Sequence, residues 1–204
     1  MKLLTANWDE GDCFGLFETE EFINDPSQIT GKDECLILWG GEDIATSIYG
    51  ENPNKHVYNK YPSSRDLREM ELVKKAIELN VPIIGICRGA QLLCAMAGGT
   101  LAQHIEGHGN SHLVTLDDED GSVIHCNSSH HQMMLPPPSA KILATSMETW
   151  GNGENNKSIK YNSTNEVVWF PNIKALGIQP HPEWTNCPKD FLDYCIRKIH
   201  EYIL

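Results

Sequence analysis

The sequence predicts an α/β fold, a three-layer sandwich in which helices flank a central, mostly parallel sheet. Two apolar runs of strand length, 35–39 and 81–86, each end at a turn that contains glycine. Near-continuous apolar strands are typical of parallel strands that are buried on both faces. A helical pattern lies between the two runs, so that strand, helix and strand form a right-handed βαβ unit. Shorter runs from about residue 111 onward predict added antiparallel strands in the C-terminal half.

The segment between the two runs has the pattern of an amphipathic helix from about Ser64 to Leu79. Ser63 or Ser64 can cap its N-terminus, and Asn80 stands where a C-cap belongs. Its apolar stripe is expected to consist of Leu67, Met70, Val73, Ala76 and Ile77. The polar segment before it, 52–64, fits a long loop better than a linker. The chain is therefore expected to form a single domain, residues 1–204.

The second half of the sequence alternates short strand-type runs with turn clusters, among them 151–156. Strands are expected at 112–116, 122–126, 142–146, 158–162 and 166–170. A last strand, 175–179, precedes a terminal helix, 188–204. This helix is expected to bury Phe191, Leu192, Cys195, Ile196, Ile199 and Ile203. The stretch before Gly40 shows no obvious second strand.

Charge and cysteine content limit the class of protein. Sixteen basic and 28 acidic residues give a formal net charge of −12. A protein that binds nucleic acid or an anionic membrane would carry a basic patch, so neither partner is expected. No apolar run approaches ~18 residues, and neither a membrane span nor a signal peptide is expected. The seven cysteines form no CxxC pair, which predicts reduced thiols in a cytoplasmic protein. The acidic run 117–120 is expected in a solvated turn.

One cysteine lies in a motif that is typical of a nucleophile. The segment Gly85-Ile86-Cys87-Arg88-Gly89 stands between a buried strand and a second helix, which is expected to end near Ala97. It is the cysteine form of the G-x-S-x-G elbow. The tight turn needs flanking glycines, and it lifts the sulfur of Cys87 clear of the sheet edge. The N-terminal N–H groups of the helix favour a thiolate at this position. The other six cysteines lack this context and are expected to pack in the interior.

A thiol nucleophile needs a base, and the base needs a group that orients it. Among the nine histidines, His181 directly follows the last expected strand. Residues two apart in an extended chain point to the same side, so Glu183 can reach the His181 ring and fix its tautomer. The backbone N–H groups of Arg88 and Gly41 are expected to donate to an oxyanion.

Together these motifs resemble the class I glutamine amidotransferase-like superfamily. The closer match is its γ-glutamyl hydrolase branch, peptidase family C26, which includes γ-glutamyl-γ-aminobutyrate hydrolases. The resemblance covers roughly residues 34–184. It is carried by 38–44, 47–51, Arg65-Asp66, 85–93, 98–101, 127–132 and 179–183. The Cys-Arg-Gly elbow and the Ser-Ser-His-His-Gln segment favour C26 over amidotransferase subunits of purine or pyrimidine synthesis. The resemblance implies a flavodoxin-like arrangement of the sheet.

Carried over by position, the resemblance implies a catalytic triad of Cys87, His181 and Glu183, with Gly41 and Arg88 as oxyanion donors. It also implies which residues hold the α-amino and α-carboxylate ends of a γ-glutamyl group. These are Gln91, Ser128, Ser129 and His130. No cofactor is implied. In the implied mechanism the thiolate attacks the γ-carbonyl, His181 protonates the leaving nitrogen, and water hydrolyses the thioester.

The resemblance implies a hydrolase of small γ-glutamyl conjugates that releases glutamate and an amine or amide. Candidate substrates are a γ-glutamyl amine, as in polyamine degradation, or γ-glutamyl-CDP-amidate, as in capsule phosphoramidate biosynthesis. One alternative is an amidotransferase subunit that supplies ammonia from glutamine to a synthetase partner, and another is a non-catalytic binding domain. The oligomeric state stays open.

The leaving-group half of the site departs from the family pattern. The expected Asp-Gly-x-x-Glu-Ala pattern is reduced to Glu166-Val167-Val168. The γ-glutamyl half therefore has the standard pattern, whereas the leaving-group half is specialised. Trp184 is expected near the leaving group, and Arg65, Arg68 or Lys60 could attract an anionic one.

Two histidine patterns raise the question of a metal site. His104, His108 and His112 recur every four residues, which is the spacing of metal ligands on one face of a helix. Glycines on either side of His108 argue against a helix there. The pair His130-His131 fits a substrate pocket and local packing better than a metal. No metal site is therefore expected.

Overall fold

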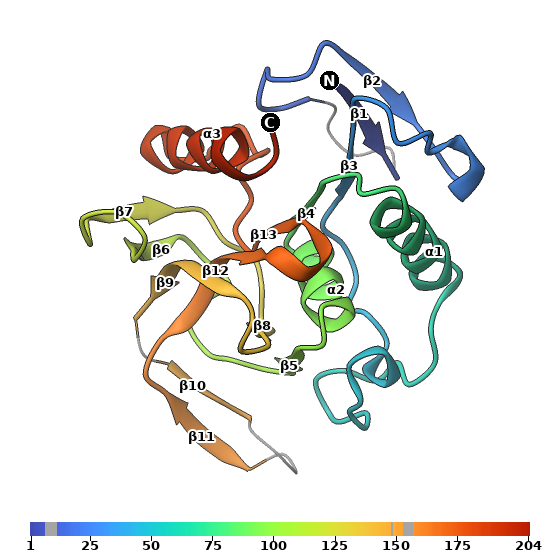
Figure 1. Cartoon of the computed structure of the whole chain (residues 1–204). Coiled ribbons are helices and arrows are strands. Elements are labelled where there is room, and N and C mark those ends of the chain that lie inside the picture. Colours follow the sequence, from blue (N-terminus) through green and yellow to red (C-terminus); the bar gives the residue numbers. More distant parts are fainter. Residues whose placement is uncertain (7–11, 148, 153–156) are drawn as a thin grey trace.

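The computed structural model describes residues 1–6, 12–147, 149–152 and 157–204, and one large sheet runs through it (Figure 1). Its nine strands lie in the order β2-β1-β3-β4-β13-β12-β9-β6-β7. The parallel half consists of β1 (Lys2–Thr5), β2 (Thr19–Phe22), β3 (Glu34–Leu38), β4 (Ile83–Ile86) and β13 (Ala175–Ile178). The antiparallel half consists of β12 (Thr164–Phe170), β9 (Lys141–Ser146), β6 (His112–Leu116) and β7 (Val123–Cys126). The predicted fold class is confirmed.

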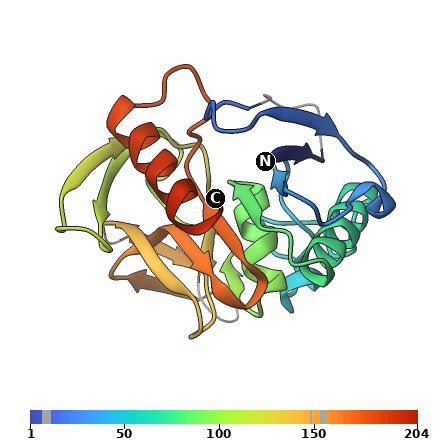
Figure 2. The same ribbon diagram turned by 45° about the horizontal axis from the view of Figure 1, so that its top comes forward.

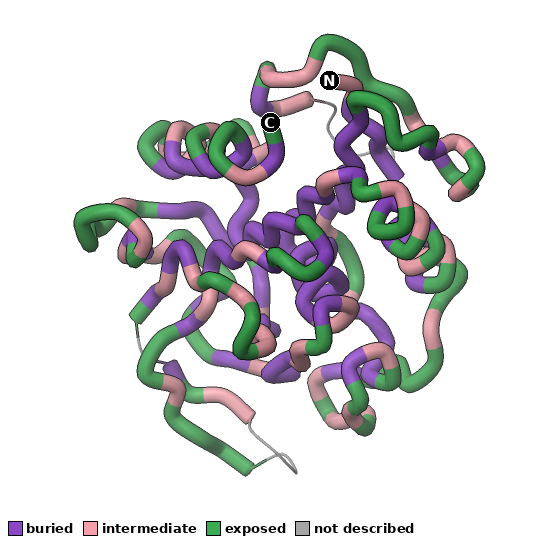
Figure 3. The backbone as a smooth tube through the Cα atoms, viewed as in Figure 1, coloured by how far each residue is buried: buried purple, intermediate pink, exposed green. Residues whose placement is uncertain are grey.

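Helices cover both faces of this sheet (Figure 2). They are α1 (Ser64–Glu78), α2 (Arg88–Met96) and α3 (Lys189–Tyr202). Successive residues of a strand point to opposite faces, so β3 shows which helix covers which face. Leu36 and Leu38 pack in one cluster with α1 and α2, whereas Cys35 and Ile37 pack in a second cluster with α3. Figure 3 shows the buried residues concentrated in the central strands and α2.

Shorter elements extend from the C-terminal half and the loops. Two further sheets pair β5 (Thr100–Ala102) with β8 (Met133–Leu135), and β10 (Thr149–Asn152) with β11 (Ser158–Tyr161). Single 3-10 turns lie at Pro26–Gln28, Thr46–Tyr49 and Pro171–Ile173. The predicted turn 151–156 begins inside β10, and its residues 153–156 lie outside the described residues. Among the helices that the structure describes, none is long and apolar enough to cross a membrane.

The N-terminal region corrects the sequence prediction. Two strands, β1 and β2, precede β3 where no obvious second strand was expected. β1 is inserted between β2 and β3 and pairs in parallel with both, and its Leu3 and Leu4 are fully buried. β2 has the sequence Thr-Glu-Glu-Phe and is largely exposed. A short polar strand at a sheet edge carries no apolar pattern, which is why the sequence did not reveal it.

The buried face of α1 differs from the predicted stripe. Ser63 caps the helix as predicted, and Val73 and Ala76 are buried. Leu67 and Ile77, however, are 55% and 37% exposed. The buried face instead carries the acidic residues Asp66 and Glu69, both of which bind a buried arginine described below. Hydrophobic periodicity cannot find a helix face on which buried carboxylates replace apolar side chains.

The acidic run 117–120 is not wholly solvated, so that prediction is wrong for Asp118. Its side chain is only 2% exposed. It accepts a hydrogen bond from Nζ of Lys198 at 2.7 Å and one from the hydroxyl of Tyr194 at 2.9 Å. Both donors belong to α3, which buries Tyr194 and Lys198 in addition to the predicted Phe191, Cys195 and Ile199. The pair of charges ties α3 to the turn between β6 and β7.

Candidate active site

Cys87 occupies the sharp turn between β4 and α2. β4 ends at Ile86 and α2 begins at Arg88, so a single residue joins strand and helix. The backbone of Cys87 has φ 49° and ψ −106°, a positive φ that side-chain-bearing residues rarely adopt. Its N–H donates to the carbonyl of Ile178 at 2.8 Å, which fixes the turn to the end of β13. This is the strand–turn–helix geometry that the elbow motif predicts.

The two elbow glycines allow strand and helix to approach closely. A Cβ at Gly85 would lie 2.6 Å from the carbonyl carbon of Gly89 and 2.7 Å from the nitrogen of Ala90. A Cβ at Gly89 would strike the carbonyl group of Leu38 in β3. Neither neighbour is a flexible side-chain end that could move aside. Both positions therefore require glycine because of space.

His181 follows β13 and is held on three sides. Nδ1 of His181 donates to Oε1 of Glu183 at 2.7 Å, as expected from their spacing. The indole of Trp184 stacks on the imidazole, with ring centroids 4.0 Å apart and planes 11° apart. Nδ2 of Asn127 donates to the carbonyl oxygen of His181 at 2.6 Å. The ring is thus fixed in tautomer and in plane.

The structure brings Cys87 and His181 together beside Gly40. A Cβ at Gly40 would lie 3.1 Å from Cε1 of His181 and 3.7 Å from Cβ of Cys87. Burial lowers the pKa of His181, but hydrogen bonds and charge from Cys87 and Glu183 outweigh burial and raise that pKa to about 9. The predicted triad residues Cys87, His181 and Glu183 therefore form one contiguous group.

Gly41 adjoins the start of α2, as an oxyanion donor must. Its φ is 142°, and a Cβ there would lie 3.6 Å from Cδ of Arg88. Nη2 of Arg65 donates to the carbonyl oxygens of Trp39 at 3.1 Å and Gly40 at 2.9 Å. In a planar trans peptide the carbonyl of Gly40 and the N–H of Gly41 point in opposite directions. Because Arg65 binds that carbonyl, the N–H of Gly41 points away from the Arg65 guanidinium.

The side chain of Arg88 points into the protein, and sequence reasoning missed its partners. It is 2% exposed and forms ion pairs with Asp66 and Glu69 of α1. Nε of Arg65 donates to the same Glu69 at 2.8 Å. Arg88 can therefore offer a substrate only its backbone N–H, which is one of the first N–H groups of α2 and has no helical acceptor. The feature of the sequence that could have revealed these partners is the pair of acidic residues, Asp66 and Glu69, three positions apart on α1.

The four predicted glutamyl-binding residues lie in two places. Gln91 is buried one turn into α2, and its Nε2 donates to Oε1 of Gln179 at 3.3 Å. Ser128 is buried and donates to the carbonyl of His108, whereas Ser129 is exposed. His130 is buried, and its ring faces Gln132 and Glu166. The side chains of Ser128 and His130 are thus engaged inside the protein.

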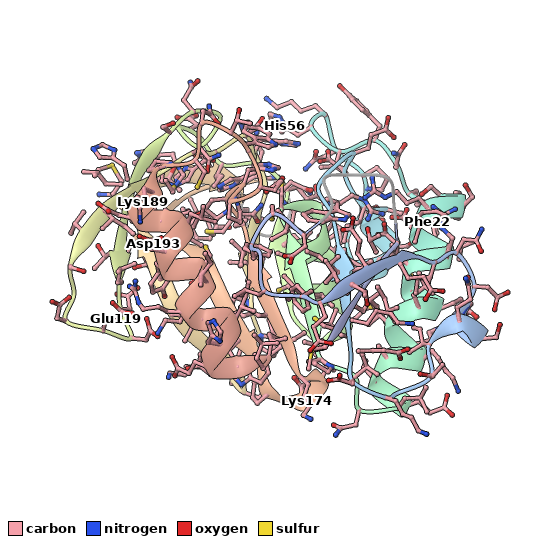
Figure 4. All side chains as sticks on the ribbon, turned by 90° about the horizontal axis from the view of Figure 1, so that it is seen from above. Phe22, His56, Glu119, Lys174, Lys189 and Asp193 are labelled. Atoms are coloured by element: carbon pink, nitrogen blue, oxygen red, sulfur yellow. The ribbon has the colours of Figure 1, made fainter. Side chains whose placement is uncertain are left out.

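Two pockets lie along the loop 52–59. One, of about 410 Å³, is lined by Glu42, Asp43, His56, Val57, Tyr58 and Asn59. The other, of about 380 Å³, is lined by Asn54, Lys55, His56, His104, Glu106, Gly151, Asn152 and Ser158. Two of the residues that line the first pocket, Glu42 and Asp43, directly follow Gly41 in the chain. His56, labelled in Figure 4, belongs to both, and its ring stacks on His104 with centroids 3.8 Å apart.

A family comparison decides where this chain belongs. The sequence model of the family described as Peptidase C26 matches residues 23–183, well over half of the chain. The chain belongs to the peptidase C26 family. This membership confirms the predicted class I glutamine amidotransferase-like superfamily.

Sequence relatives and a solved structure add two further comparisons. The glutamine amidotransferase-like protein YvdE of Lactococcus lactis is 43% identical over 97 residues, which are 48% of this chain and 40% of that protein. The carbamoyl phosphate synthase small chain of Xanthomonas axonopodis is 28% identical over 126 residues, 59% of this chain and 28% of that one. The chain thus spans less than half the length of these relatives. A glutamine amidotransferase structure from Thermotoga maritima covers 98% of this chain and 83% of its own, with a TM-score of 0.59 and 15% identity, which shows the fold.

Proposed function

We propose that this C26 protein is a γ-glutamyl hydrolase that cleaves the γ-glutamyl amide bond of a small conjugate through a thioester. The observation that carries the proposal is the meeting of the elbow residue Cys87 with the His181–Glu183 pair beside Gly40. A nucleophile, a base and a carboxylate that orients the base are the parts that acyl transfer requires.

In the acylation step, the thiolate of Cys87 attacks the γ-carbonyl carbon of the substrate. The carbonyl oxygen becomes an anion and is held by the N–H groups of Gly41 and Arg88. Nδ1 of His181 is bound to Glu183, so Nε2 is the nitrogen that faces the thiol and carries the transferable proton. As the tetrahedral intermediate collapses, Nε2 gives this proton to the leaving nitrogen, and the carbon–nitrogen bond breaks.

In the deacylation step, water attacks the γ-glutamyl thioester. The now neutral His181 accepts a proton from this water, and the same two N–H groups stabilise the second oxyanion. Collapse breaks the carbon–sulfur bond and releases glutamate. The thiolate and the imidazolium are regenerated, so no cofactor enters the cycle.

The glutamyl end of the substrate lies between Gln91 and the segment 127–130 in this proposal. Nε2 of Gln91 is directed to Gln179, which leaves Oε1 of Gln91 as an acceptor for the α-ammonium group. Because Ser128 and His130 use their side chains internally, their contribution is through backbone groups. The exposed hydroxyl of Ser129 supplies a side-chain donor for the α-carboxylate.

The leaving group extends toward the two pockets of the loop 52–59. Glu42 and Asp43 line the pocket next to Gly41, and their charge suits the cationic tail of a γ-glutamyl amine. Lys55 and two imidazoles line the second pocket, and this chemistry suits the phosphates of γ-glutamyl-CDP-amidate. Arg65 does not serve this role because its guanidinium is already bound to Glu69 and to backbone carbonyls.

The reduced thiols support a cytoplasmic location for this enzyme. All seven cysteines lie within the described residues, and none of them forms a disulfide. Reduced thiols in this number are typical of a reducing compartment.

The decisive experiment offers the purified protein a panel of substrates and measures glutamate release. The panel contains γ-glutamyl amines, a γ-glutamyl phosphoramidate and glutamine. We expect rapid turnover of one conjugate by the chain alone, and complete loss of that turnover in Cys87→Ala. Added hydroxylamine should divert the acyl group to γ-glutamyl hydroxamate, because it captures the thioester.

Cys187→Ala is the matched control, since Cys187 is a half-buried thiol outside the elbow. It should keep full turnover. Turnover of glutamine alone, seen only after a synthetase partner is added, would establish the amidotransferase subunit instead. Activity that survives Cys87→Ala would overturn the mechanism for every substrate.

A further inference from the structure

Three imidazoles surround the carboxylate of Glu166, which lies on β12 and is fully buried. Nε2 of His108 and Nε2 of His112 lie 3.5 Å and 3.4 Å from Oε1 of Glu166. Nε2 of His130 lies 3.5 Å from the other oxygen, Oε2. The proposed mechanism uses none of these four side chains, since His130 contributes to it only through its backbone.

The orientation of the rings defines where their lone pairs point. Nδ1 of each of the three histidines lies against a backbone carbonyl, which can only accept a hydrogen bond. The acceptors are the carbonyls of Glu106, Asn110 and Gln132, at 3.0, 3.2 and 2.8 Å. Each ring therefore carries a proton on Nδ1 and directs Nε2 toward the carboxylate. Metal-binding histidines are commonly held in this way, with a carbonyl that accepts from one ring nitrogen and directs the other at the ion.

The atoms that face one another in this cluster lack ordinary hydrogen bonds. Nε2 of His112, Nε2 of His130 and Oε2 of Glu166 are buried, and among the described residues none has a hydrogen-bond partner of normal geometry. Among the described residues, the hydroxyl of Thr164 lies between two members of the cluster, at 2.7 Å from Oε1 of Glu166 and 3.0 Å from Nε2 of His108. Buried polar atoms without partners are costly, and ring nitrogens that face a carboxylate need positive charge between them, either a proton on Nε2 or a metal ion.

The spacing of these atoms fits a metal ion. Charge-assisted hydrogen bonds between imidazolium and carboxylate are ~2.7–2.9 Å long. Ligand atoms ~2.0–2.1 Å from a tetrahedral metal are separated by ~3.4 Å. The separations of 3.4 and 3.5 Å from Glu166 to His112 and His108 match the second value. The three ligand atoms all lie within 4.8 Å of one another.

We propose that His108, His112 and Glu166 bind a divalent transition-metal ion, with Zn²⁺ preferred. Two imidazoles and one carboxylate form a ligand set typical of zinc. His130, on the second carboxylate oxygen, stands beside the ion rather than within the group of three. The sequence did not predict this site because the spacing of His108 and His112 suggested metal ligands only if both lay on one helix. The chain from 104 to 112 forms no helix, and the fold instead brings Glu166 of β12 to them.

The proposed metal site adjoins the segment 127–130, which is proposed to hold the glutamyl group. The carbonyl of His108 accepts hydrogen bonds from the hydroxyl of Ser128 and from the N–H of His130, the latter at 3.2 Å. An ion that fixes His108 therefore also fixes this segment. We expect metal binding to position the segment, so its removal should raise KM for a γ-glutamyl substrate more than it lowers kcat.

The test measures zinc binding directly and does not depend on activity. The protein is stripped with a chelator, titrated with Zn²⁺ by calorimetry, and its metal content is measured by mass spectrometry. The titration uses the Cys87→Ala variant, because a thiol beside an imidazole can also bind zinc. We expect one zinc ion per chain and a melting temperature that rises with zinc concentration.

Glu166→Gln and His112→Gln keep the approximate shape of each side chain and remove one ligand. Each should abolish stoichiometric binding and the zinc-dependent rise in melting temperature. His125→Gln is the control, because His125 is an exposed histidine on the neighbouring strand β7. It should bind zinc as the Cys87→Ala parent does.

Two results would overturn the proposal. One is that the stripped Cys87→Ala protein binds no zinc. This titration leaves all three ligands in place, so it tests the proposal even if the ligand variants fail to fold. The other is that Glu166→Gln binds as tightly as its parent, which would place the ion elsewhere. Neither result would affect the γ-glutamyl hydrolase proposal, since that mechanism uses no metal.

Discussion

Glu183 determines over which pH range His181 can act as an acid. The carboxylate binds Nδ1 of the ring at 2.7 Å, and with Cys87 it overcomes burial to raise the pKa of His181 to about 9. A raised pKa means that the ring stays protonated through neutral pH and loses its proton as the pH passes about 9. In the proposed mechanism, the protonated form donates to the leaving nitrogen. Acylation should therefore persist up to this pH and decline above it.

Replacing Glu183 tests this dependence. In Glu183→Gln the negative charge is lost, so the imidazolium loses a stabilising partner. We expect kcat/KM to fall by about 10²–10⁴-fold and the alkaline limb of the pH profile to move to lower pH. Steady-state rates from pH 6 to 10 measure both effects. Asp193→Asn, in the exposed Lys189–Asp193 pair of α3 (Figure 4), serves as the control. An unchanged alkaline limb in Glu183→Gln would mean that another group titrates.

Single residues also mark the limits of sequence reasoning. Cys87 and the pair His181–Glu183 were predictable because each depends on neighbours in the chain: an elbow between glycines, and two residues on one side of an extended segment. The hydrogen bond from Asn127 to the carbonyl of His181 and the ion pairs of Arg88 join segments far apart in sequence. No local pattern encodes such contacts.

At the scale of elements, the contact between α2 and β3 sets the position of Cys87, the proposed nucleophile. Gly89, in the first turn of α2, lies against the carbonyl of Leu38 at the end of β3. The helix can reach this position only because residue 89 has no side chain.

Gly89→Ala should push α2 away from the sheet. We expect an unfolding free energy lower by about 1–3 kcal/mol, because overpacking against backbone cannot be relieved by a rotamer change. Urea denaturation measures the difference. Gly109→Ala is the matched control, since its Cβ would meet open space, and it should be near neutral. Equal effects of the two substitutions would contradict the close contact.

The ion pairs between α1 and α2 give a second prediction for elements. Glu69 is fully buried and pairs with Arg88, which is 2% exposed. Removing one partner leaves a buried charge without compensation, which typically costs about 3–5 kcal/mol. We expect Glu69→Ala to lose this much by chemical denaturation, whereas Glu71→Ala, on the exposed side of the same helix, should lose less than ~1 kcal/mol. A loss as small as that of Glu71→Ala would contradict the buried pairing.

At the scale of the whole molecule, the sequence predicted the sheet from its centre outward. β3 and β4 are fully buried and read as apolar runs, so the βαβ rule predicted them as parallel strands. β13 is also fully buried and was predicted as the last strand, without a place in the sheet order. β6, β7 and β9 each combine buried residues with more exposed ones, and their bounds were predicted within one residue. The edge strand β2 was missed because it is largely exposed to solvent, and an exposed strand does not require an apolar pattern in the sequence.

The positive φ of Cys87 determines how substitutions at this position change the stability of the protein. The residue holds a conformation that costs side-chain-bearing residues about 1–3 kcal/mol, and Cys87→Ala keeps this cost because it keeps a Cβ. Cys87→Gly removes this conformational cost. We therefore expect that inactive variant to unfold at a higher urea concentration than the wild-type protein or Cys87→Ala. A Cys87→Gly protein no more stable than Cys87→Ala would show that the turn is unstrained. Selection for stability alone would therefore favour loss of the thiol, and only selection for turnover can retain a cysteine at this turn.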